Sequence, residues 1–255
     1  MTIMAMGVWL TVMIGGGGWW VWQDRLAYQR FQTLTDTGAR QRVYLRWIAQ
    51  SFTILVGASI VSLWLAGGLA PFDGYPAAFE PLRLTLQPRR SAGDGHMLPM
   101  LVGLTIGVGI SVAVQWWRLR RMMVTNAGTT EALLPRNRRE GAIALLLSAN
   151  AGFSEELFFR LALPLLLFQL THAPALSMGL SVLCFGLAHA YQGWKGILGT
   201  MAAGALLTLY YCSHGSLVRV MLVHALIDVI ALLVRPALTD LFARRQSPRW
   251  LALAR

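Results

Sequence analysis

The sequence predicts an all-α integral membrane protein, a bundle of about seven transmembrane helices within a range of six to eight. Of its 255 residues, 56% are hydrophobic and only 13% are charged, and the mean hydropathy is +0.54. Soluble domains carry roughly a quarter of their residues as charged side chains. The apolar content excludes a disordered chain. The two cysteines are too few for a disulfide scaffold.

Seven segments of the chain are nearly free of charge, and each approaches the ~20 residues that a helix needs to cross the hydrocarbon core. The first basic residue, Arg25, follows the first of these segments, so a cleaved secretory signal is not expected. The predicted spans are 1–22, 47–70, 97–117, 141–170, 174–191, 196–212 and 216–234.

Two connecting segments carry recognisable patterns. Segment 23–46 mixes arginine with leucine, tyrosine and phenylalanine, which is typical of an interfacial helix or of an extension of the neighbouring helices. Segment 71–96 contains four prolines and is expected to form an irregular loop on the outer side.

The net charge of +11 is explained by membrane orientation. A strongly basic chain is often a nucleic-acid partner, but these charges follow the predicted loops. With the N-terminus outside, 17 of the 22 Lys and Arg residues lie in inside segments and three in outside loops. The sequence therefore predicts a cytoplasmic C-terminus and no nucleic-acid partner. The 21 arginines against one lysine are typical of a GC-rich bacterial genome, which favours the inner membrane.

A few ionisable residues lie inside predicted spans, where each charge costs on the order of 3 kcal/mol. Such residues face one another or a water-filled cavity and mark functional sites. They are the acids Glu155, Glu156 and Asp228, the imidazoles His189 and His224, and the cation Arg160. Arg219 also lies in a span but is only one turn from its end, so its side chain is expected to reach the interface.

The spacing of the first group separates two adjacent carboxylates. Glu156 and Arg160 are four residues apart and share a helix face, so they can form an ion pair. Glu155 lies about 100° further around the helix. We expect Glu155 to remain available as a carboxylate that can take a proton.

Two further pairs, each four residues apart, lie on later spans: Phe185 with His189, and His224 with Asp228. Asp228 is expected to accept a proton from one ring nitrogen of His224 and so to fix its tautomer. Together with Glu155, these residues could activate a water molecule.

The three motifs Glu155-Glu156-x-x-x-Arg160, Phe185-x-x-x-His189 and His224-x-x-x-Asp228 resemble those of the CPBP intramembrane proteases. That family contains the CAAX prenyl endopeptidases of the Rce1 type and the bacterial Abi and bacteriocin-immunity proteins. The resemblance covers about residues 141–234, the expected catalytic core. The spans and charges predict N-terminal transmembrane helices with interfacial and loop segments at 1–140 and a basic cytoplasmic tail at 235–255.

The resemblance also implies roles for the site residues. Glu155, with Glu156 beside it, would activate the water, and His189 and His224 would hold a metal or the oxyanion. Asp228 stands where the CAAX endopeptidases have Asn and where other bacterial members have Asp, and its charge favours a metal or an imidazolium. Arg160 and Phe185 would support the site.

The chemistry of the water activation stays open at this stage. Either a zinc ion is held by His189 and His224, with Glu155 as a further ligand, or Glu155 activates the water without a metal. The zinc signature HExxH is absent. The expected partners are the lipid bilayer and a membrane-associated protein or peptide. Gly103 and Gly107 form a GxxxG motif that allows helix packing or a homo-oligomer.

Two other functions remain as alternatives. Acidic and histidine side chains within spans also line proton pathways, which would suit a proton-coupled transporter or channel. A non-catalytic immunity or scaffold protein on the same fold is the second alternative.

The depth of these residues raises a geometric question. At 1.5 Å per residue, Glu155 and His189 lie about 22 Å from the outer ends of their predicted spans, and His224 about 12 Å. Either the span boundaries are not uniformly right, or segment 141–170 extends beyond the bilayer.

Overall fold

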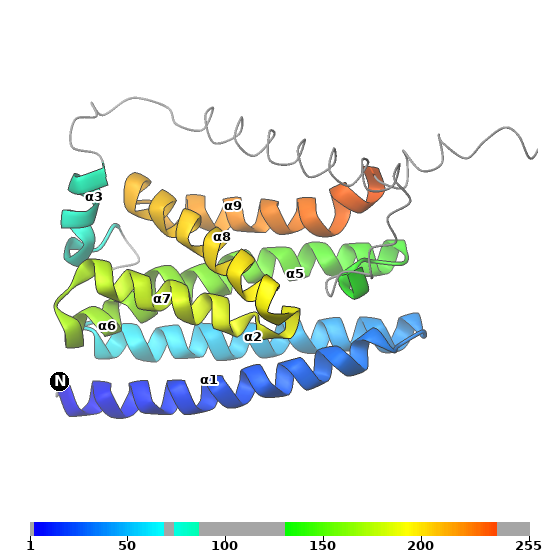
Figure 1. Ribbon diagram of the computed structural model, residues 1–255, viewed down its shortest axis with the longest axis horizontal. Helices are drawn as coiled ribbons and strands as arrows, with labels where there is room; N and C mark the ends of the chain where they lie inside the picture. The colour runs from blue at the N-terminus through cyan, green and yellow to red at the C-terminus, as the bar shows by residue number, and fades with distance from the viewer. Residues whose placement is uncertain (1–2, 69–73, 87–130, 239–255) are drawn as a thin grey trace, which may run out of the picture.

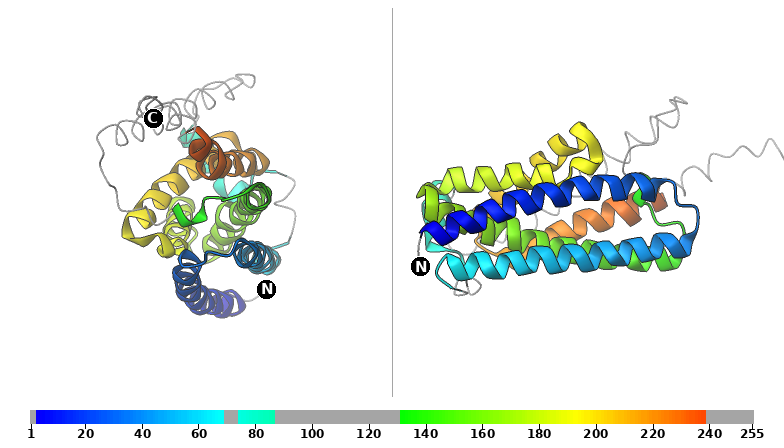
Figure 2. Two further views of the ribbon diagram at one scale, coloured as in Figure 1. Left: turned by 90° about the vertical axis from the view of Figure 1, so that its right-hand side faces the viewer. Right: turned by 90° about the horizontal axis from the view of Figure 1, so that it is seen from below.

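The computed structural model describes residues 3–68, 74–86 and 131–238, and in these ranges the chain forms helices and no strand. The long helices run side by side as one bundle (Figures 1 and 2). Four of the described helices are long and apolar enough to cross a membrane: Ile3–Gln32, Thr37–Leu65, Ala190–His214 and Leu217–Leu238. The predicted all-α membrane fold is confirmed.

The helices follow six of the seven predicted spans, and the span at 97–117 lies outside the described residues. In chain order they are α1 (Ile3–Gln32), α2 (Thr37–Leu65), η2 (Ala77–Phe79), α3 (Glu80–Leu86), η3 (Glu131–Leu133), α5 (Arg138–Glu156), η4 (Leu157–Ala162), α6 (Leu163–Thr171), α7 (Pro174–Ala188), η5 (Ala190–Gln192), α8 (Gly193–His214), α9 (Leu217–Val229) and η6 (Ile230–Val234).

The two connecting segments differ from simple loops. Segment 23–46 is helical apart from a turn between α1 and α2, so the helix-extension interpretation is right. The irregular loop expected at 71–96 is wrong for residues 77–86, which form η2 and α3. Pro81 is compatible with this helix because it lies in the first turn, where its missing N–H needs no partner.

Local sequence signals fix the helix ends. Asp36, Asn137 and Ser216 each accept a hydrogen bond from a backbone amide of the following first turn, as N-cap residues do. Pro174 occupies the first turn of α7, and α8 ends at Gly215 with a φ of 66°, a conformation that favours glycine.

A buried ion pair joins α2 to the start of α5. The Nε of Arg40 lies 3.3 Å from the Oε2 of Glu140, and both side chains are fully buried. Thr37 donates its hydroxyl to Glu140 at 2.8 Å, and the backbone amide of Arg136 donates at 3.0 Å. Burial alone would raise the pKa of Glu140, but these hydrogen bonds and the Arg40 charge hold it below its usual range.

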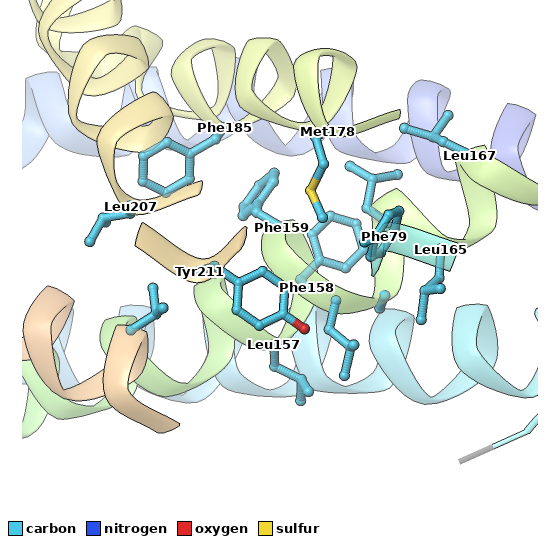
Figure 3. Packing of buried hydrophobic residues seen from close by; sticks show 14 of the residues in the cluster. Phe79, Leu157, Phe158, Phe159, Leu165, Leu167, Met178, Phe185, Leu207 and Tyr211 are labelled. Carbon is cyan, nitrogen blue, oxygen red and sulfur yellow. The ribbon is translucent and has the colours of Figure 1, made fainter. Parts of the chain in front are cut away.

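The centre of the bundle is an aromatic and leucine core around η4, a π-helical turn in the run from α5 to α6 (Figure 3). All six residues of η4 are buried. Phe159 lies edge-on to Phe185 of α7, with ring centroids 5.3 Å apart. π-Helical turns are frequent at functional sites, and this one directly follows Glu155 and Glu156.

The helical run from Arg138 to Thr171 is much longer than the ~20 residues of one span, which agrees with a segment that extends beyond the bilayer. Helix α7 is shorter, with 15 residues. The turn between α7 and α8 lies partway along the bundle, well before the end formed by the α1–α2 turn (Figures 1 and 2). His189, at the end of α7, is therefore held inside the bundle near Glu155.

Helices α5 and α9 cross in close contact at Gly152. A Cβ atom at this position would lie 2.5 Å from the carbonyl oxygen of Met221 and 2.9 Å from the Cβ of Ala225. Only glycine allows this approach, which brings the end of α5 next to the His224 region of α9.

Replacing Gly152 by alanine should force α5 and α9 apart and lower the free energy of unfolding by about 1–3 kcal/mol, the usual cost of overpacking. SDS-induced unfolding in mixed micelles measures this change. The matched control is Gly199→Ala in α8, where nothing lies within 4 Å and alanine should be neutral or stabilising. Equal effects of the two substitutions would contradict the close crossing.

Candidate functional site

Glu156 uses both of its carboxylate oxygens inside the bundle. Its side chain is fully buried, with Oε2 3.0 Å from the Nε of Arg160 and Oε1 2.5 Å from the Nδ1 of His224. The predicted pair of Glu156 and Arg160 is confirmed. The contact with His224 links α5 to α9 across 68 residues of sequence.

Arg160 extends this link to α7 and α8. Its guanidinium lies 4.3 Å from the centroid of the Phe185 ring, in a cation–π arrangement. Its Nη2 donates to the carbonyl oxygen of Gly204 at 3.4 Å. A Cβ at Gly204 would lie 2.7 Å from the Phe185 ring, so a glycine leaves the space that this ring fills.

The structure corrects the expected partner of His224. Asp228 was expected to accept the proton of one ring nitrogen, but its Oδ2 lies 3.8 Å from Nε2, beyond hydrogen-bond range. Glu156 accepts at Nδ1 instead. The physical reason is the close approach at Gly152, which brings a longer acidic side chain from α5 within reach.

The two ring nitrogens of His189 have different neighbours: Nδ1 forms a hydrogen bond to the backbone, and Nε2 faces Glu155. Its Nδ1 lies 2.8 Å from the carbonyl oxygen of Phe185, a contact in which the nitrogen donates. In the neutral ring, Nε2 then carries the lone pair. This Nε2 lies 3.9 Å from the Oε2 of Glu155.

Phe185 forms a wall that contacts both imidazoles. Its ring centroid is 4.9 Å from that of His189 and 6.1 Å from that of His224, and its side chain is buried. The predicted site residues of the three motifs are therefore brought together from α5, η4, α7 and α9.

Glu155 differs from its neighbour Glu156 because its carboxylate is not neutralised by the arginine. It is partly exposed, and its Oε2 makes no hydrogen bond within the described part of the chain. Glu155 and His189 line a cavity of about 130 Å³, enough for several water molecules. A gap of 3.9 Å between polar atoms beside a cavity is suited to a shared water molecule.

The cavity also contains residues that the sequence analysis did not identify. Asp24 of α1 was assigned to a connecting segment, but it lines the cavity together with Asn150 and Tyr191. The spacing of Trp20, Asp24 and Tyr28, each four residues apart, places them on one helix face and could have indicated this.

The described side chains do not fit a zinc site well. A catalytic zinc needs three protein ligands at about 2 Å. In residues 3–68, 74–86 and 131–238, no three His, Cys, Asp or Glu side chains gather in such a group. The zinc expected at His189 and His224, with Glu155, remains a prediction.

Comparison with known proteins gives one match. Residues 138–230 match the family model described as Type II CAAX prenyl endopeptidase Rce1-like. The match covers all three motifs and confirms the resemblance seen in the sequence. No curated protein and no solved structure matches the chain.

The two adjacent glutamates should respond differently to the same substitution. Glu156→Gln leaves Arg160 and His224 buried without their carboxylate and should cost about 3–5 kcal/mol of unfolding free energy. Glu155→Gln breaks no short contact and should change it by less than about 1 kcal/mol. Unfolding in mixed micelles compares the two variants. Equal destabilisation would show that Glu156 is not the carboxylate that holds the bundle together.

Proposed function

We propose that this protein is an integral-membrane endopeptidase that hydrolyses a peptide bond in a membrane-associated protein or peptide, because residues 138–230 match the Rce1-like family model. The observation that carries the proposal is the pair formed by Glu155 and His189. The Oε2 of Glu155 has no hydrogen-bond partner among the described residues and lies 3.9 Å from the Nε2 of His189 at the edge of a cavity.

Glu155 acts as the general base in this proposal. A water between Glu155 and the Nε2 of His189 donates one hydrogen to each. As the oxygen attacks the scissile carbonyl carbon, its proton passes to Glu155, which then delivers it to the leaving amine. The hydrogen bond from Nδ1 to the Phe185 carbonyl oxygen keeps Nε2 as an acceptor.

His224 and Asp228 supply the second half of the site. Both ring nitrogens of His224 face carboxylates, with Glu156 at Nδ1 and Asp228 at Nε2. A ring placed in this way can carry two protons and donate from Nε2 to the oxyanion that develops on the substrate. Asp228, which is about one third exposed, would stabilise the positive charge of that ring from 3.8 Å, without a hydrogen bond.

Glu156, Arg160 and Phe185 are positioning residues in this scheme. Glu156 and Arg160 are almost completely buried and neutralise each other, and Phe185 separates the two imidazoles. They orient His224 and His189 without contacting the substrate.

We propose the metal-free form of the reaction, because the described ligand geometry gathers no group of three for zinc. If a zinc ion were bound, His189 and His224 would hold it and it would polarise the scissile carbonyl. Zinc in a one-to-one ratio in the purified, active protein would contradict the metal-free form.

We also propose a multi-pass arrangement in the inner membrane of a bacterium with the C-terminus in the cytoplasm. The distribution of Lys and Arg over the predicted loops supports this orientation.

Glu155→Gln should reduce cleavage at least about 100-fold, because the variant lacks the general base. The assay uses the purified full chain in dodecyl maltoside micelles. The probes are membrane-anchored reporter peptides, both prenylated and unprenylated. The matched control is Glu80→Gln at the start of α3, which also removes one carboxylate and should leave cleavage unchanged.

Equal cleavage by the wild-type protein and Glu155→Gln would refute the assignment. Proton flux in liposomes that depends on Glu155, without any cleavage, would favour a proton-coupled transporter instead.

A further inference from the structure

The cavity beside Glu155 has a lining that the proposed hydrolysis does not require. It lies between α1, α2, α5 and the end of α7, and the aromatic residues around it are Trp20, Tyr28, Trp47, Phe159 and Tyr191. The rings form a continuous path. Tyr191 lies 5.9 Å from His189 and 5.1 Å from Tyr28, which lies 6.3 Å from Trp47.

The cavity lining includes acidic side chains but no strongly basic ones. Asp24 and Glu155 contribute two carboxylates, and none of the described residues of the lining is Lys or Arg. No ion pair neutralises Asp24 within the described ranges. Two like charges on one cavity repel each other, and a cation between them would remove that repulsion.

Asn150 adds a third acceptor from α5. Its side chain is 8% exposed, and its Nδ2 donates to the hydroxyl of Ser51 at 2.8 Å. Because this bond fixes the orientation of the amide, Oδ1 is the atom left to accept a hydrogen bond from a ligand. Oδ1 has no hydrogen-bond partner in the described part of the chain. A buried, unpartnered acceptor in a cavity wall indicates a ligand that donates hydrogen bonds.

Aromatic faces, carboxylates and an unpaired carbonyl oxygen together fit an ammonium or guanidinium group. We propose that this cavity binds the side chain of a Lys or Arg residue of the peptide substrate, close to the scissile bond. The proposal rests on the endopeptidase function. Placing a basic side chain within the bilayer costs free energy. A peptide that carries one would therefore bind more tightly when an acidic cavity receives that side chain. The volume of about 130 Å³ suits one long side chain rather than a folded segment.

The first test measures binding and does not depend on cleavage. The purified full chain in dodecyl maltoside is titrated with n-pentylamine, which resembles a lysine side chain, and with the uncharged n-pentanol. The apparent Kd comes from the shift in melting temperature. We expect n-pentylamine to bind and Asp24→Asn to weaken it about tenfold. The control Glu80→Gln, outside the cavity, should leave it unchanged.

Equal binding of n-pentanol, or unchanged binding in Asp24→Asn, would overturn the proposal. If Asp24→Asn does not fold, Asn150→Leu tests the same cavity from α5 and should also weaken n-pentylamine binding.

The second test measures cleavage of anchored peptides that differ in one residue beside the scissile bond: Lys, the uncharged norleucine, or Glu. The wild-type protein should prefer Lys about tenfold in kcat/KM, and Asp24→Asn should lose this preference. Cleavage without a preference would overturn the cation site and leave the endopeptidase function intact. Binding of n-pentylamine without any cleavage would support the cation site and contradict the endopeptidase function. The natural ligand would then be an amine from another source, such as a lipid headgroup.

Discussion

The carboxylate of Glu156 is the group on which the rest of this structure depends. It is fully buried in a membrane protein and contacts Arg160 on one oxygen and His224 on the other. A buried charge costs several kcal/mol unless its partners are in place, and a half-satisfied network is worse than an apolar core. These partners come from η4 and α9, and Arg160 also reaches Phe185 of α7 and Gly204 of α8. This one carboxylate of α5 is therefore linked to four other parts of the bundle.

The same arrangement explains why two adjacent glutamates have different chemistry. Successive residues of a helix point about 100° apart, so Glu156 faces Arg160 and α9 while Glu155 faces the cavity and His189. Glu156 takes up the arginine charge and leaves Glu155 with an oxygen that no described group satisfies. A carboxylate in that state, beside a cavity, is available to bind water and to accept a proton.

The all-α membrane fold and most of the site residues could be predicted from the sequence. Long segments without charge indicate the spans, and the few charges inside those segments indicate the buried site. Spacing also predicted the pair of Glu156 and Arg160, a contact within one helical turn. The contact between Glu156 and His224 was missed because it depends on how closely α5 and α9 approach at Gly152, which no local pattern reports. Asp24 was missed for a similar reason, since its place beside Glu155 follows from the packing of α1 against the end of α7.

A double-mutant cycle between Glu156 and His224 tests most directly whether this buried link organises the site. Glu156→Gln, His224→Gln and the double variant are unfolded in mixed micelles, and the coupling energy is taken from the three changes. A short contact between buried partners predicts a coupling of at least about 1.5 kcal/mol, because the second substitution adds little once the first has broken the link. Additive effects, within about 0.5 kcal/mol, would contradict the account.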